Sequence, residues 1–265
     1  MPSKERQRQL AREKVQRQMA RRAAILARRR RRQAILGSAA AVVAVIALAG
    51  FAYAQLGGGK PAAKKPLAKA PTTALCAYTK PKAGQGGPVP RKVDLPPING
   101  IRRSGLVKVQ LVTNQGPLTL TLDAAKAPCT VNSFVSLVQQ KYFDKSPCHR
   151  VTTRGIFVLQ CGDPSGSGSG SPGYVFADEN LPAQQNAPIV YRAGTVAMAN
   201  SGPNTNGSQF FIVYKDTQFN PSYIIFGSVS AGLPVVTKIA AAGSKPAGDG
   251  KPIKPVLIQT AKVLP

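Results

Sequence analysis

The 265-residue chain has no tryptophan, a single histidine and only 10 acidic residues. With His149 as the one imidazole, and no serine in a nucleophile-elbow pattern, the sequence argues against a Ser-His-Asp hydrolase. The four cysteines, Cys76, Cys129, Cys148 and Cys161, show neither a CxxC pair nor the Cys/His spacing of a zinc site. We therefore expect no metal and no other cofactor.

Basic residues are abundant, and 36 Lys and Arg give a formal net charge of +26. Most of the excess precedes the last 160 or so residues: residues 1–33 hold 13 Lys and Arg against 2 Glu, and residues 55–103 hold 10 against 1 Asp. From Ser104 onward there are 13 against 7 acidic residues. A basic run such as Arg28–Arg32 is able to bind the phosphates of a nucleic acid, with release of counterions. The segment that follows this run indicates a membrane anchor instead, so nucleic acid is not the expected partner.

An uncharged run of 21 residues, rich in Ala, Val, Ile and Leu, occupies residues 34–54. As a helix it would span about 31 Å, the thickness of a bilayer core. Basic residues before it, and only Lys60 close behind it, predict a single-pass signal-anchor in the cell membrane, with a cytoplasmic amino terminus and an extracytoplasmic remainder. Two alternatives stay open: secretion after cleavage following Ala54, at the small-x-small pattern that begins at Ala52, and a buried core helix.

Composition divides the chain into four predicted segments. Residues 1–33 form a basic cytoplasmic arm without a sustained apolar face, and residues 34–54 form the transmembrane signal-anchor. Residues 55–103 are crowded with Pro, Gly, Ala and Lys, which is typical of a flexible tether, although Cys76 in its least linker-like part could attach it to the domain. Residues 104–265 are predicted to fold as one domain.

Short apolar runs dominate that domain. Alternating apolar residues on either side of the turn at 114–116 predict two paired strands between Leu106 and Leu122. Helical spacing predicts one helix within 128–142, with Thr130 as its N-cap, and a second near 233–242. Many short strands with few helices predict a β-barrel or sandwich. Further strand-like runs occur at 156–159, 195–198, 210–213, 223–226 and 255–263.

The Ser/Gly alternation at 166–170 has the composition of a flexible linker. Because it lies between two strand-like runs, we expect it to be a loop of the same domain.

Two motifs stand out in the same region: Arg150 followed by IFVLQCGD at 156–163, and MANSGPNTNGSQFF from Met198 to Phe211. The second resembles the long signature of the cyclophilins almost word for word, and the resemblance covers roughly Gly105–Pro265. It implies a mainly β fold, an eight-stranded antiparallel β-barrel capped by two α-helices, preceded here by the predicted single transmembrane helix. It also implies peptidyl-prolyl cis-trans isomerase activity, which needs no metal, nucleotide or nucleophile.

The resemblance implies which residues of this sequence correspond to the family's active site. Arg150 looks like the catalytic arginine, and Gln160 and Asn200 look like the groups that hold the substrate backbone. An apolar pocket for the substrate proline is implied by three phenylalanines. These are Phe157, Phe211 and Phe219, and the remaining substrate-binding positions are Val158, Ala199, Gln209 and Tyr223.

The resemblance implies rotation of X-Pro bonds in exported or extracytoplasmic polypeptides, and so assistance to protein folding. Two other interpretations stay open: a low-turnover, proline-peptide-binding scaffold or holdase at the membrane, and an RNA- or lipid-binding arm with the barrel as passenger. The resemblance also suggests a Cys129–Cys148 disulfide, because a helix start and the strand of Arg150 could lie close in such a barrel.

Three departures from the familiar eukaryotic pattern bear on the groove. The segment 217–223 is one residue shorter and the chain has no tryptophan, so we expect weakened cyclosporin binding. Tyr223 stands in place of a histidine and Val158 in place of a methionine. Arg150 and Gln160 lie two residues further apart, with Arg154-Gly155 as the extra pair.

Overall fold

The computed structural model describes residues 76–82, 87–182 and 187–265. The predicted basic arm and the predicted signal-anchor at 34–54 lie outside these residues. Within the described ranges, no helix is both long and apolar enough to cross a bilayer. The described part belongs to one compact unit, residues 71–265.

Two eight-residue strands form a β-hairpin within the sheet. Strands β1 (Leu106–Thr113) and β2 (Gly116–Asp123) pair antiparallel, with Val109 opposite Leu120. Alternate residues of both strands are buried, because side chains of a strand point to its two faces in turn. The predicted strand pair is confirmed.

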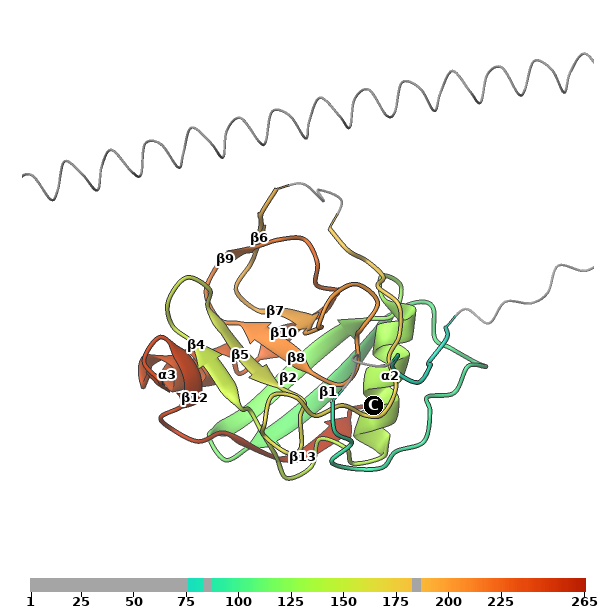
Figure 1. Cartoon of the computed structure of the whole chain (residues 1–265), viewed down its shortest axis with the longest axis horizontal. Helices are drawn as coiled ribbons and strands as arrows, with labels where there is room; N and C mark the ends of the chain where they lie inside the picture. The colour runs from blue at the N-terminus through green and yellow to red at the C-terminus, as the bar shows by residue number, and fades with distance from the viewer. Residues whose placement is uncertain (1–75, 83–86, 183–186) are drawn as a thin grey trace, which may run out of the picture. The chain divides into compact units, whose positions relative to one another are not determined.

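Eleven of the described strands belong to one curled antiparallel sheet that forms a half-barrel (Figure 1). Its end strands, β11 and β3, are not paired with each other, so the described sheet is open rather than the predicted eight-stranded barrel. Several two- to four-residue strands account for the higher strand count. Register shifts, or β-bulges, occur within β1 and β10. The other strands of this sheet are β3 (Ser146–Pro147), β4 (Arg150–Thr152), β5 (Val158–Cys161), β7 (Thr195–Met198), β8 (Phe210–Val213), β10 (Ile225–Ala231), β11 (Ser244–Lys245), β12 (Asp249–Pro252) and β13 (Leu257–Val263), while β6 (Ile189–Tyr191) and β9 (Thr217–Phe219) pair separately.

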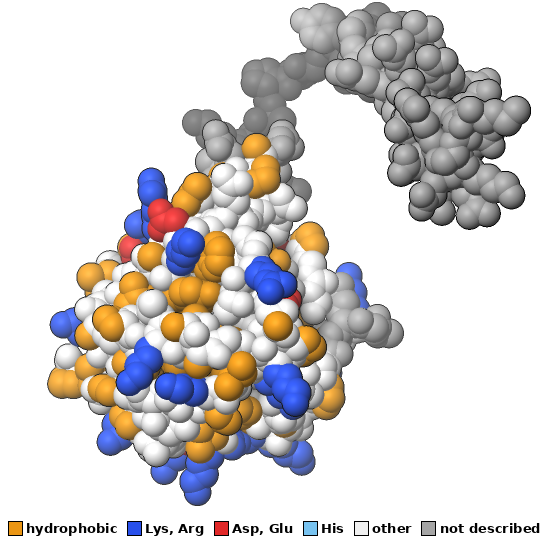
Figure 2. Space-filling model, turned by 90° about the vertical axis from the view of Figure 1, so that its left-hand side faces the viewer, with side chains coloured by type: hydrophobic (Ala, Val, Ile, Leu, Met, Phe, Trp, Pro, Cys, Tyr) orange, Lys and Arg blue, Asp and Glu red, His pale blue; other side chains and the backbone are white. Residues whose placement is uncertain are grey.

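Basic side chains are spread over the domain surface. On the face shown in Figure 2, Lys and Arg side chains are frequent and Asp and Glu side chains are sparse. The charge on this face is therefore mostly positive.

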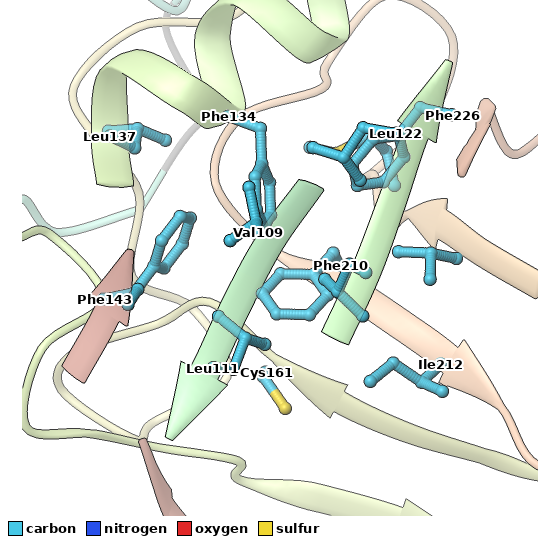
Figure 3. Packing of buried hydrophobic residues seen from close by; sticks show 14 of the residues in the cluster. Val109, Leu111, Leu122, Phe134, Leu137, Phe143, Cys161, Phe210, Ile212 and Phe226 are labelled. Carbon is cyan, nitrogen blue, oxygen red and sulfur yellow. The ribbon is translucent and has the colours of Figure 1, made fainter. Parts of the chain in front are cut away.

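Helix α2 (Pro128–Gln139) covers one side of the sheet (Figure 1). Its Phe134 ring packs edge-on against Phe210 of β8 at 5.2 Å and lies 4.9 Å from Phe143 (Figure 3). The predicted helix is confirmed, but Thr130 as its N-cap is wrong. The N-cap is Ala127, and the backbone N–H groups of Cys129 and Thr130 donate to the Glu179 carboxylate at 3.3 and 2.5 Å.

The second predicted helix is α3 (Leu233–Ala241), with Pro234 in its first turn. It starts from Gly232 at φ +92°, where a Cβ would stand 2.3 Å from the Pro117 carbonyl oxygen. Glycine is needed at that position both for the backbone conformation and for the close approach to β2. The fold is therefore mainly β with two helices in its described part.

The part of the predicted tether that the structure describes is held against the domain. We call residues 76–82 and 87–103 the strap. Thr79 and Val175 exchange two backbone hydrogen bonds at 2.9 and 2.8 Å. The Arg91 guanidinium donates to three carbonyl oxygens that follow α2, those of residues 141, 142 and 144. Composition predicts a free chain here, but hydrogen bonds to the backbone and a disulfide fix it instead.

The cysteines pair differently from the expectation. Disulfides join Cys76 to Cys129 and Cys148 to Cys161, so the predicted Cys129–Cys148 bond is wrong. Cys129 lies at the start of α2 and meets the strap, as the possible attachment through Cys76 anticipated. Cys148 and Cys161 meet because Cys148 shortly precedes β4 and Cys161 ends β5, and these strands pair with Arg150 opposite Gln160.

Candidate functional site

A continuous chain of hydrogen bonds runs across three neighbouring strands. Arg150 on β4 donates from Nη1 to Gln160 Oε1 on β5 at 3.1 Å. Gln160 donates from Nε2 to Gln209 Oε1 at 2.9 Å. Gln209 in turn donates to the carbonyl oxygens of Gly168 and Gly170 at 2.9 and 3.1 Å. Three predicted site residues are thus brought into one network.

The outer end of this network is a carboxylate that sequence reasoning missed. Arg150 donates from Nε and Nη2 to the two oxygens of Asp249, both at 2.7 Å. Strand β12 brings Asp249 opposite Thr152 of β4. Because Asp249 is 99 residues from Arg150 in sequence, no local pattern could signal the pair. A two-bond contact of this kind fixes the plane of the guanidinium.

The ion pair affects both groups. The hydrogen bonds with Asp249 raise the pKa of Arg150, and the same bonds hold the pKa of Asp249 below its ordinary value. A guanidinium has five N–H bonds. One hydrogen on each terminal nitrogen is left over by the contacts to Gln160 and Asp249. The side chain is 36% exposed, so these hydrogens belong to a group that solvent or a bound molecule can reach.

Beside the network lies a small aromatic cluster. The rings of Phe211, Phe219 and Tyr223 lie 5.3 to 5.4 Å from one another between centroids. Pairing of β6 with β9 places Phe219 opposite Ile189, and the Tyr191 ring backs Phe219 at 5.1 Å. Val158 and Ala199 pack in the same cluster, which is separate from the main core. The structure therefore groups five of the predicted substrate-binding residues.

Phe157 is not part of this cluster. Its ring packs against Tyr214 at 6.0 Å, with Lys215 Nζ 4.6 Å from its centroid. Alternation along the chain explains the difference, since Val158 and Gln160 face the site and Phe157 turns away from it. Ile156, which sequence reasoning did not select, packs against the cluster instead. The extra pair Arg154-Gly155 lies in the connection between β4 and β5, with Gly155 at φ +71°.

Asn200 lies next to the cluster. Its side-chain amide donates to the Ser222 carbonyl oxygen at 2.8 Å and accepts from the Gly202 N–H at 3.2 Å. These bonds tie the loop after β7 to the residue before Tyr223. Asn200 also lines a cavity of about 320 Å³ together with Gln160, Ala199 and Gln209.

The Ser/Gly loop at 166–170 is ordered around a buried acid, Asp163, which sequence reasoning also missed. The Asp163 carboxylate accepts bonds from the N–H groups of Ser165, Gly168 and Gly170 at 2.7 to 3.1 Å, and from two serine hydroxyls. Burial by itself raises the pKa of this carboxyl, but the hydrogen bonds outweigh it and lower the pKa to about 2. This loop supplies the carbonyl oxygens that hold Gln209.

The lowered pKa of Asp163 predicts a pH-dependent contribution to stability. The contribution is complete above the ordinary carboxyl pKa and is lost as the pH falls toward 2, and it amounts to about 2 kcal/mol. Asp163→Asn should lower the free energy of unfolding by that amount at pH 7 and by less at pH 3, measured by urea denaturation. Asp94→Asn, at an exposed carboxylate, is the control. Equal losses for Asp163→Asn at both pH values would contradict the assignment.

Known proteins share sequence and structure with this chain. The family model "Cyclophilin type peptidyl-prolyl cis-trans isomerase/CLD" matches residues 108–263. The "Probable peptidyl-prolyl cis-trans isomerase B" of Mycobacterium tuberculosis is 52% identical over 163 residues, covering 57% of this chain and 53% of that protein. Its namesake in Mycobacterium leprae is 48% identical over 168 residues, covering 59% and 57%. The chain thus spans about half the length of these curated relatives.

Among solved structures, a Cryptosporidium parvum cyclophilin type peptidyl-prolyl cis-trans isomerase aligns with a TM-score of 0.52 and 30% identity, covering 61% of this chain and 99% of that one. The matched family model includes Arg150, Gln160, Phe211 and Asp249 within its bounds. The chain therefore belongs to the cyclophilin-type peptidyl-prolyl cis-trans isomerase family.

Proposed function

We propose that this protein is a peptidyl-prolyl cis-trans isomerase that rotates X-Pro bonds in exported or extracytoplasmic polypeptides and so assists their folding. One observation carries the proposal: the Arg150 guanidinium is fixed by Asp249 and Gln160 on neighbouring strands, beside the Phe211 cluster. Family membership supports the same activity.

Rotation about an X-Pro bond is slow because amide resonance is lost midway, at a cost of about 18–20 kcal/mol. In the twisted state the prolyl nitrogen becomes pyramidal and carries a localised lone pair. A fixed N–H donor aimed at that nitrogen binds the twisted state better than either planar isomer, which lowers the barrier. No bond is made or broken in this reaction.

The residues of the site divide this work. The ring cluster of Phe211, Phe219 and Tyr223 offers an apolar surface for the proline ring, while Gln160 and Asn200 offer amide groups to the peptide backbone. Arg150 donates one of its two remaining hydrogens to the prolyl nitrogen. Holding the chain on both sides of the bond makes the rotation act on that bond alone.

The first test of the mechanism replaces Arg150. Arg150→Ala should lower kcat/KM by about 100- to 1000-fold, because one fixed donor to the transition state is lost. The measurement is protease-coupled isomerisation of a proline tetrapeptide. Arg192→Ala, at an arginine that is 80% exposed and paired with Asp216, is the matched control and should keep full activity. Unchanged turnover in Arg150→Ala would sink the mechanism.

Normal binding of proline peptides by the wild-type protein without any rate enhancement would select the alternative function, a proline-peptide-binding scaffold or holdase.

Weakened cyclosporin binding stays a prediction, and it rests on the absence of tryptophan from the chain.

Asp249 is predicted to act through Arg150. Asp249→Asn keeps the shape of the side chain but replaces one acceptor oxygen by a donor amide, so the guanidinium loses its two-bond contact. We expect kcat to fall about 10-fold with little change in KM, because the donor is misaligned while the apolar surface stays intact. Asp249→Glu should restore part of the rate. A loss confined to KM would point to a binding role instead.

We further propose that residues 34–54 anchor the protein in the cell membrane, with the isomerase domain on the extracytoplasmic side. The uncharged run and the basic residues before it support this orientation, and two disulfides suit an oxidising compartment. Protease added to intact cells should release the domain and leave the arm at 1–33 protected. A mature amino terminus at Gln55, found by mass spectrometry, would instead support cleavage after Ala54.

A further inference from the structure

A hollow of about 500 Å³ borders the guanidinium of Arg150. Gln160 also lines it, and strands β11 and β12 supply Lys245, Asp249 and Lys251. We call the hollow bordered by these five residues the basic hollow. The proposed mechanism uses Arg150, Gln160 and Asp249 but leaves both lysines without a role.

The two lysines stand directly opposite each other. In the antiparallel pair of β11 and β12, Lys245 is the register partner of Lys251, so both side chains lie on one face of the pair. Both residues are exposed, and within the described residues neither forms an ion pair. Like charges that face each other across a strand pair repel, which destabilises the free protein. A bound anion would offset that repulsion.

Alternation along β12 places the lysines on the face that carries the Arg150 ion pair. Asp249 and Lys251 are two residues apart, so their side chains point to the same side of the strand, and their Cα atoms are about 7 Å apart. Asp249 accepts two bonds of 2.7 Å from Arg150. An extended peptide advances about 3.3 Å per residue. A side chain two or three residues from the proline therefore reaches the lysines when the prolyl nitrogen is at Arg150.

Backbone contacts fix the lysines in this position. Strand β12 pairs with β4, and the Thr153 N–H donates to the Gly248 carbonyl oxygen at 2.8 Å. A Cβ added to Gly250 would stand 2.5 Å from the carbonyl carbon and oxygen of Lys245, so β11 and β12 approach more closely than a side chain there would permit. The pair of β11 and β12 is therefore held firmly against the strand that carries the catalytic arginine.

The charges around the basic hollow favour an anion. Among the described residues that line it, Asp249 is the one acid, and Arg150 balances its charge. His149 also borders the hollow, and burial lowers its pKa, so the ring is neutral at pH 7. Lys245 and Lys251 are thus left as two unbalanced positive charges.

Arg154 adds a further positive charge near the same place. Its side chain packs against the turn between β11 and β12, where a Cβ added to Gly248 would lie 3.0 Å from Arg154 Cδ. Arg154 and Gly155 are the extra pair that separates Arg150 from Gln160 in this sequence. The extra pair therefore brings a basic side chain to the turn beside the basic hollow.

From these observations we propose that the basic hollow binds a carboxylate side chain of the substrate, and that the enzyme prefers X-Pro bonds with Asp or Glu two or three residues away. Lys245 and Lys251 bind the carboxylate, and Arg154 adds to the attraction. The inference rests on the proposed function for its substrate class. It assigns a specificity-determining role to two lysines that take no part in the rotation itself.

The test compares proline peptides in which one position at a time, up to three residues from the proline on either side, carries Glu or its neutral isostere Gln. With the full-length protein, kcat/KM is measured by exchange NMR, which needs no coupling protease, and the dissociation constant by calorimetry. At one position the wild-type protein should prefer Glu by about 5- to 10-fold at low salt, because two exposed ion pairs are gained. Added salt should shrink this preference, since it screens exposed charges.

Lys245→Gln and Lys251→Gln should each reduce the Glu preference, and Lys251→Glu should reduce it most. Lys262→Gln, at an exposed lysine on β13, is the matched control and should keep the preference. Because replacing either lysine of the hollow also relieves their repulsion, the free energy of unfolding should not fall. Urea denaturation checks this and shows that the variants fold.

Equal values for the Glu and Gln peptides in the wild-type protein, or an unchanged preference in both Lys→Gln variants of the hollow, would overturn the inference. The lysines would then serve only to keep the end strand β11 from pairing with other chains. A Glu preference in the dissociation constant without any rate enhancement would refute the isomerase proposal and leave the site standing. Rate enhancement without a Glu preference would do the reverse, so the two failures are distinguishable.

Discussion

The two-residue period of β5 is the constraint on which both the core and the site depend. Leu159 and Cys161 point into the main core, while Val158 and Gln160 point to the opposite face, where the site lies. Because β4 and β8 pair with β5 on either side, Arg150 and Phe211 are held opposite Gln160. A shift of one residue in this register would send the site side chains into the core and the core side chains outward.

Local patterns in the sequence predicted the elements well. Alternation in β1 and β2, and helical spacing in α2 and α3, reflect short-range rules that any half-buried strand or helix obeys. The family resemblance also located Arg150, Gln160 and Gln209 of the network, though not Asp249, and most of the ring cluster. Phe157 is the exception. Because side chains alternate along the chain here, its ring points away from the site and packs against Tyr214.

Several of the missed features come from long-range partners, whereas the missed Asp163 binds the nearby residues 165–170. Glu179 caps α2 from about 50 residues away, and Asp249 meets Arg150 across 99 residues. The cysteine pairs follow strand adjacency and the path of the strap, neither of which is encoded near the cysteines. Composition failed for the strap because the contacts that fix it are with distant residues. Tyr78 is buried against Tyr174 and Phe176, and hydrogen bonds and a disulfide add to this burial, although Leu95 and Ile98 are exposed.

Gly87 has a consequence for how relatives of this protein can be compared. Gly87 lines the cavity of about 320 Å³, and a Cβ added there would stand 1.5 Å from the Ser169 carbonyl oxygen, so main-chain atoms pack against main-chain atoms at this point. This part of the cavity outline is therefore set by the path of the backbone. Two family members with identical side chains around the cavity would differ in its outline if their preceding segments took different paths, and an alignment restricted to the family domain would not reveal the difference.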